Sequence, residues 1–176
     1  MHFDMMQQPS KSRTLEVTVL SADDLRINGK PATQNIFVVV RAESITSHTT
    51  TESKGDDGEG GGGFHSWNEK FMVDIGMHAK SITFEVKCKT SMGVVKDVGV
   101  ARIAVSDFLG GSVQDHVLKF LSYRLRDYDG LKNGVIHFSV RVVVPPEEAV
   151  VTAVASEKVV GEQSSSSDGV VTGSPV

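Results

Sequence analysis

The stretch from Gly55 to Trp67, GDDGEGGGGFHSW, combines carboxylates and glycines, the residue types found in ion-binding and phosphate-binding loops. A phosphate loop needs its glycines between a strand and a helix, usually with a Gly-Lys-Ser/Thr ending, whereas a strand pattern follows this run. A calcium loop needs about 6 to 8 oxygen ligands. Asp56, Asp57 and Glu59 supply few of them, on a glycine-rich backbone. The pattern therefore favours a long connection between two strands, with calcium binding as the alternative.

Catalytic residue patterns are missing from the sequence. The six histidines have no metal-ligand spacing, and no serine stands in a nucleophile elbow. The single cysteine, Cys88, lies at the end of an apolar strand pattern, which favours simple packing over a reactive thiol. We therefore expect that the protein is not an enzyme.

Length and composition predict one domain inside a reducing compartment. The chain has 176 residues, with 18 Lys and Arg against 22 Asp and Glu, so no general positive field would recruit nucleic acid. One cysteine cannot form an internal disulfide, and the first residues lack a secretory signal pattern. No apolar run approaches the roughly 18 to 20 residues that span a bilayer. Any membrane contact is therefore expected to be peripheral.

Eight short segments alternate polar and apolar residues or are rich in β-branched residues, with Gly, Asn or Asp between them. They are residues 14–20, 35–43, 45–51, 67–75, 81–89, 98–105, 117–126 and 134–144. The pattern predicts an all-β fold, an eight-stranded antiparallel β-sandwich over residues 13–144. The first and last segments alternate regularly, which favours positions inside a sheet rather than at its edge. Residues 1–12 and 145–176 are predicted to be disordered tails.

Six segments together resemble the C2 domain family. They are LEVTVLSADDL (15–25), IFVVV (36–40), WNEKFMV (67–73), VGVARIAVSDFLGG (98–111), LSYRLRD (121–127) and GVIHFSVRV (134–142). The resemblance extends over roughly residues 14–144 and includes strand order and spacing. The second half, and the closing VVTGSPV, are similar to the small plant C2 proteins that associate with copines, the BONZAI-associated group.

This resemblance implies a sandwich whose three loops at one end bind calcium and touch phospholipid head groups. On this chain the three loops are expected at Ala22–Gln34, Lys54–Ser66 and Cys88–Asp97. The glycine-rich stretch is therefore expected to form the middle loop, at the end where the family meets membranes.

The calcium site of the family is expected to be degenerate in this chain. Its ligands are aspartates of the first and third loops, because a hard divalent cation needs several anionic oxygens. In the first loop this sequence has Asn28 and Asn35 near two of the ligand positions, and in the third loop it has Cys88 and Thr90. Asp97 remains as an acidic position. Asn28, Asn35 and Asp97 are thus the candidate metal ligands, and we expect weak or no calcium binding and no cofactor.

The third loop, KCKTSMGVVKD, carries apolar residues between lysines, and the first loop repeats the pattern on a smaller scale. The predicted lipid-binding residues are Arg26, Ile27, Lys30, Lys87, Lys89, Met92, Val94, Val95 and Lys96. An apolar tip beside cations can insert shallowly while the cations meet anionic head groups, without calcium. In the alternative interpretation the apolar residues pack on the core and the lysines are merely solvated.

The sequence and the resemblance together predict a non-enzymatic C2 module that binds an anionic phospholipid surface and a copine-family partner. It is expected in the cytoplasm, peripheral at the inner face of the plasma membrane. The resemblance alone implies a negative regulator of plant cell death and defence. Two alternatives stay open: a calcium-dependent phospholipid binder, and a pure protein-interaction module without lipid binding.

Overall fold

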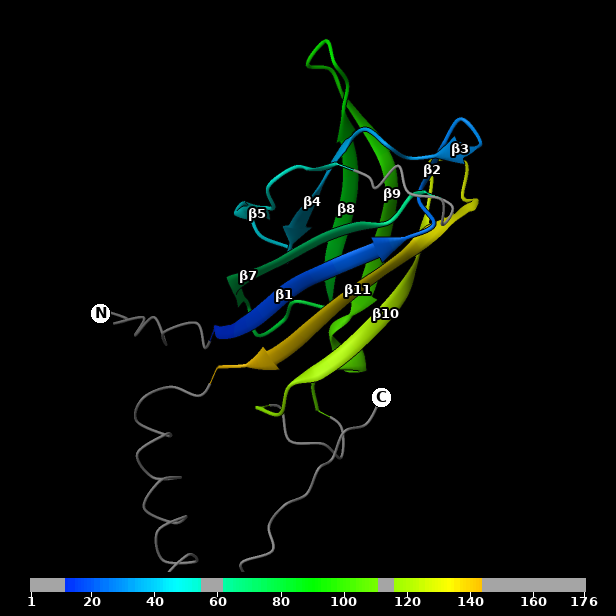
Figure 1. The fold of residues 1–176 in the computed structure, drawn as a ribbon. Coiled ribbons are helices and arrows are strands. Elements are labelled where there is room, and N and C mark those ends of the chain that lie inside the picture. Colours follow the sequence, from blue (N-terminus) through cyan, green and yellow to red (C-terminus); the bar gives the residue numbers. More distant parts are fainter. Residues whose placement is uncertain (1–11, 55–61, 111–115, 144–176) are drawn as a thin grey trace, which may run out of the picture. The chain divides into compact units, whose positions relative to one another are not determined.

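The computed structural model describes residues 12–54, 62–110 and 116–143, and these residues form antiparallel strands with one short 3-10 turn (Figure 1). The strands are β1 (Arg13–Asp23), β2 (Arg26–Ile27), β3 (Lys30–Pro31), β4 (Asn35–Arg41), β5 (Ser47–Thr49), β6 (Ser53–Lys54), β7 (His65–Ile75), β8 (Ser81–Lys89), β9 (Val95–Ala104), β10 (Lys119–Arg126) and β11 (Lys132–Val142), and the turn is η1 (Val105–Asp107). The predicted all-β fold is confirmed.

Eight strands follow one another in the order β5-β4-β8-β9-β10-β11-β1-β7, and β6 pairs separately with β4. Among the described residues, β9 and β10 are joined by a single backbone pair, Val100 with Arg126. The strands on either side of this pair face one another across the core, because Phe84 of β8 stacks on Phe138 of β11 with ring centroids 4.4 Å apart. The path is therefore a sandwich of two four-stranded layers, β5-β4-β8-β9 and β10-β11-β1-β7.

The first and last long strands lie inside a layer, as their alternation predicts. Leu15, Val17 and Val19 of β1 are fully buried, and β1 pairs with β11 on one side and with β7 on the other. A strand paired on both sides and buried on one face needs apolar residues at every second position. Where β1 begins and β11 ends, the backbone N–H of Val143 donates to the carbonyl of Thr14 at 2.9 Å.

Two of the expected loops contain more regular structure than the sequence pattern indicated. The first loop includes the hairpin β2–β3, whose two turn residues Asn28 and Gly29 both have positive φ, 54° and 75°, as a type I′ turn requires. The third loop, expected at 88–97, is reduced to residues 90–94. Cys88 pairs with Lys96 in the ladder between β8 and β9, so Cys88, Lys96 and Asp97 lie in strands.

Several expectations concern residues beyond the described part of the chain. The predicted tails lie outside it except for residue 12, and so does the middle of the glycine-rich connection, residues 55–61. A compact unit ends at Val143. In the three described ranges no helix is long and apolar enough to cross a membrane.

Candidate functional site

Four connections meet at one end of the sandwich. At the end of β1, Asp23 pairs with Val135 near the start of β11, which brings the β10–β11 turn beside the first loop. At the start of β4, Asn35 pairs with both Lys89 of β8 and Lys54 of β6, which brings the second and third loops to the same end. We call this the apical end, and its described residues are 24–34, 62–64, 90–94 and 127–131.

Asn133 of β11 connects the first loop to β9. Its side chain is 8% exposed, and its Oδ1 accepts from the backbone N–H of Arg26 at 2.8 Å. Its Nδ2 donates to the carbonyl oxygens of Arg26 at 3.0 Å and of Val98 at 2.8 Å. One buried amide thereby satisfies backbone groups of the first loop and of β9 from its place on β11. No sequence motif had pointed to this residue.

A buried histidine joins the first loop to the residues around the second. His65 is 1% exposed, and its Nε2 lies 2.8 Å from the carbonyl oxygen of Ala32, while its Nδ1 lies 3.1 Å from that of Ser53. The ring stacks on Trp67, with centroids 6.2 Å apart. In addition, the N–H of Leu25 donates to the carbonyl of Gly63 at 3.1 Å. Both side-chain and backbone contacts therefore hold the first loop and the residues around the second loop together.

Gly134 permits a close approach between the start of β11 and the first loop. Its φ is +81°, and a Cβ at this position would lie 2.5 Å from the carbonyl oxygen of Asp23 and 2.9 Å from the side chain of Leu25. Only glycine fits both the backbone conformation and the space.

The third loop ends in an exposed apolar tip. Its turn is closed by two backbone hydrogen bonds of 2.9 Å, from the N–H of Thr90 to the carbonyl of Val94 and from the N–H of Gly93 to the carbonyl of Thr90. Met92 is 89% exposed, and Val94 and Val95 are about half exposed. The predicted apolar residues of this loop thus point into solvent together rather than onto the core.

The lysines around this tip differ in their surroundings. Lys87 lies on the outer face of β8 with its Nζ 3.6 Å from carboxylates of both Glu85 and Asp97. Lys89 pairs with Glu52 at 3.4 Å, and Lys96 is exposed on β9. Lys89 and Lys96 are therefore nearer to the tip and more accessible than Lys87.

The first loop contributes cations but little exposed apolar surface. The guanidinium of Arg26 bonds to the carboxylate of Asp24 at 3.3 Å and to the carbonyl of Gly29 at 3.4 Å. Ile27 packs partly buried against the core, while Lys30 is exposed. The third loop therefore carries the more prominent apolar tip.

The three candidate metal ligands have separate surroundings. Asn28 occupies the β2–β3 turn, and the Nδ2 of Asn35 donates to Glu52 at 3.0 Å. Asp97 accepts a hydrogen bond from the hydroxyl of Tyr128 and lies beside Lys87. In the described part of the chain, no group of three or more His, Cys, Asp or Glu side chains could hold a metal ion. Calcium at Asp97 would have to displace these two partners.

A nucleophile, a base and an acid lie in a row on the outer face of β10, β11 and β1. The hydroxyl of Ser122 is 2.6 Å from Nδ1 of His137, whose Nε2 is 2.6 Å from the carboxylate of Asp23. A triad enzyme also needs amide donors that converge on the reacting oxygen. Ser122 lies within β10, directly opposite His137 in the ladder between β10 and β11. The row thus consists of polar contacts between neighbouring strands, and such contacts contribute to strand pairing.

Comparison with known proteins agrees with this architecture. Residues 13–120 match the C2 domain family. The chain is 37% identical over 140 residues to BON1-associated protein 2 of Arabidopsis thaliana, an alignment that covers 78% of this chain and 65% of that relative. The chain thus spans just under two thirds of the length of this relative.

Solved structures with similar folds share little sequence with this chain. A C2 domain of plant extended synaptotagmin 1 aligns with a TM-score of 0.57 and 20% identity, over 74% of this chain and 93% of that one. Human GIVD cytosolic phospholipase A2 aligns with a TM-score of 0.58 and 14% identity, over 78% of this chain and 18% of that one. Only a small part of the phospholipase is therefore similar, and the similarity concerns the fold.

Proposed function

Because this chain belongs to the C2 domain family, we propose that it is a non-enzymatic module that docks on anionic phospholipid surfaces through its apical end, without a calcium switch. The observation that carries this proposal is the exposed tip of the third loop, where Met92 and Val94 stand beside Lys89 and Lys96. A membrane offers this tip an apolar layer under a negative surface, and the exposed residues match both.

The expected strength of such docking is modest. Removing an apolar side chain of this size from water contributes about 1.5–3 kcal/mol, and a lysine near an anionic surface contributes about 1 kcal/mol. Two partly inserted residues and two lysines therefore supply a few kcal/mol, which corresponds to dissociation constants near the millimolar range. The module would bind membranes reversibly and would need a second contact for lasting residence.

A copine-family protein is the partner that we propose for this second contact. Support comes from the similarity to a relative whose name records an association with BON1. Val117, Leu118 and Phe120 are exposed near the start of β10, which lies at the opposite end from the apical loops because Lys119 pairs with Val140. A partner bound there would leave the apical end free. On the same resemblance we propose a place at the inner face of the plasma membrane and a restraining role in plant cell death and defence.

Co-sedimentation of the full chain with phosphatidylserine-containing vesicles tests membrane docking. The experiment is run in calcium and in chelator, at low and at physiological salt. We expect equal binding with and without calcium, weakened by salt because exposed charges are screened. The variant Met92→Ser/Val94→Ser should lose about tenfold or more in affinity. Met77→Ser serves as the matched control, because Met77 is about half exposed in the β7–β8 connection at the other end.

Each alternative function has its own result in this experiment. Binding only in calcium would replace the proposal with a calcium-dependent lipid binder. No binding under any condition would leave a protein-interaction module, to be examined with a purified copine-family protein and the variant Phe120→Ser.

A further inference from the structure

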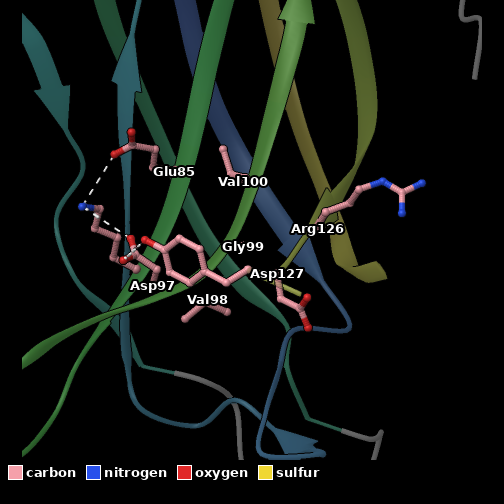
Figure 2. Close-up of a pocket in the computed structure, with 9 residues that line it drawn as sticks. Glu85, Asp97, Val98, Gly99, Val100, Arg126 and Asp127 are labelled. Atoms are coloured by element: carbon pink, nitrogen blue, oxygen red, sulfur yellow. Dashed lines mark hydrogen bonds and ion pairs between the residues drawn. The ribbon is translucent and has the colours of Figure 1, made fainter. Parts of the chain in front are cut away.

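A pocket of about 230 Å³ opens beside the backbone pair that joins the two layers, between β9 and the β10–β11 turn (Figure 2). Its walls include Glu85, Lys87, Asp97, Val100, Asp127 and Tyr128. Figure 2 shows Glu85 and Asp97 on one side of the pocket, while the side chain of Arg126 extends away from it. Carboxylates therefore outnumber the cations that face the pocket, and the site favours a positively charged group.

The carboxylates of this pocket already receive hydrogen bonds. Glu85 accepts from Arg41 at 3.2 Å, and Asp97 accepts from Tyr128. The Nζ of Lys87 also lies 3.6 Å from each of these two carboxylates. The Oδ1 of Asp127 accepts from the backbone N–H groups of residues 129 and 131, at 3.0 and 2.9 Å. A ligand with N–H donors would have to compete for these acceptors. A quaternary ammonium has no donor to satisfy and responds only to the negative field and to aromatic faces.

An exposed aromatic ring stands at this pocket. Tyr128 is 84% exposed although its hydroxyl is bound to Asp97, so its ring is fixed at one end and open to solvent over most of its surface. Tyrosine faces attract quaternary ammonium groups. Val100, about two-fifths exposed, adds apolar surface that suits methyl groups. The pocket therefore combines an anionic wall, an aromatic ring and an apolar contact.

The distance from the third-loop tip back to the pocket would place the pocket in the head-group layer of a membrane. Asp97 follows Val94 by three residues, which at about 3.3 Å per residue places it about 10 Å back along β9. A tip that inserts about 5–10 Å, to the boundary of the acyl chains, would hold the pocket among the head groups. Choline is the outermost part of a phosphocholine head group, and a protein arriving from water meets it first.

We propose that this pocket binds the choline group of a phosphocholine lipid. The inference rests on the proposed membrane function and adds a head-group preference to it. Tyr128 supplies the aromatic face, and the three carboxylates of Glu85, Asp97 and Asp127, which outnumber Lys87 on the pocket wall, supply the negative field. The phosphate of the same head group stays at the mouth of the pocket, in water.

Free phosphocholine, titrated into the ¹⁵N-labelled full chain, tests the pocket without a membrane. We expect saturable amide shifts at residues 98–100 and 126–128, and binding at least fivefold weaker for phosphoethanolamine, which differs only by three methyl groups. Tyr128→Leu should weaken phosphocholine binding about fivefold, while Tyr128→Phe, which keeps the ring, should retain it. No saturable shifts, equal binding of phosphoethanolamine, or an unchanged Tyr128→Leu would overturn the proposal.

Vesicle binding distinguishes this proposal from the proposal that the third-loop tip docks on membranes. With phosphatidylserine held constant, replacing phosphatidylethanolamine by phosphatidylcholine should raise the affinity of the natural chain for vesicles severalfold. The affinity of the Tyr128→Leu variant should stay unchanged. The variant Met92→Ser/Val94→Ser should lose vesicle binding but keep free phosphocholine binding, so failure of the tip is distinguishable from failure of the pocket. Binding of free phosphocholine without a gain on choline-containing vesicles would overturn the lipid assignment. A trimethyl-lysine peptide that binds tenfold more tightly than phosphocholine would assign the pocket to a protein partner instead.

Discussion

Replacing Asn133 by alanine should destabilise the apical end, because this buried side chain makes three hydrogen bonds there. The change removes three hydrogen bonds, of 2.8, 3.0 and 2.8 Å, and leaves backbone groups of Arg26 and Val98 without their partner. Each bond contributes about 1 kcal/mol net, and an unsatisfied buried group costs about 1–3 kcal/mol. Because water can reach the Arg26 side of the site, we expect a loss of about 2–4 kcal/mol in the free energy of unfolding.

Urea unfolding at neutral pH, followed by far-ultraviolet circular dichroism, measures this loss. Asn35→Ala is the matched control, because Asn35 makes one exposed hydrogen bond to Glu52 and its removal should cost about 0.5 kcal/mol or less. Loosening of the first loop in Asn133→Ala should also appear as faster amide exchange at residues 25–32. A loss below about 0.5 kcal/mol, equal to that of the control, would refute the view that this amide holds the apical elements together.

Three further predictions follow from individual contacts. Gly134→Ala should cost at least about 2 kcal/mol in unfolding free energy, because residue 134 has a positive φ and the new Cβ would lie 2.5 Å from the carbonyl oxygen of Asp23. The control Gly130→Ala, with φ of +77° and open space around the new Cβ, should cost only about 1 kcal/mol. Burial raises the pKa of the Cys88 thiol, so a thiol reagent at pH 8 should label it much more slowly in the folded than in the urea-unfolded protein, and equal rates would contradict this. Burial, and next the bond to Asp107, raise the pKa of Tyr123 to about 12. The stability that the protonated phenol contributes is therefore complete below pH 10 and lost between about pH 10 and 12. In that window the free energy of unfolding of the natural chain should fall relative to that of Tyr123→Phe, and parallel curves would contradict this.

The strands were predictable because their physical cause is local. Alternation at Leu15, Val17 and Val19 suffices to orient a strand with one buried face, and it needs no knowledge of the partner strands. The β2–β3 hairpin was also within reach of the sequence, because Asn28-Gly29 is a strong signal for a two-residue turn. The prediction for Asn28 treated it only as a metal ligand, and so the hairpin was missed.

The details of the apical end depend on contacts between residues far apart in the chain. Asn133 meets Arg26 across 107 residues, and neither residue carries a sequence signal of that meeting. The length of the third loop depends on where the ladder between β8 and β9 stops, and on a register shift between Val86 and Lys87 that alternation alone does not locate. The pocket beside Asp97 and Tyr128, likewise, exists only because β9 meets the β10–β11 turn.

The hydrogen bond between Val143 and Thr14 has a consequence for how the domain could be rewired. It holds the start of the first strand and the end of the last strand side by side, so a short Gly/Ser linker could connect them directly. A circular permutant with that linker, reopened in the exposed β4–β5 connection at Ser44, would keep all strand pairs of the sandwich. We therefore expect the fold to depend on which strands are neighbours in space, and not on the order in which the chain visits them.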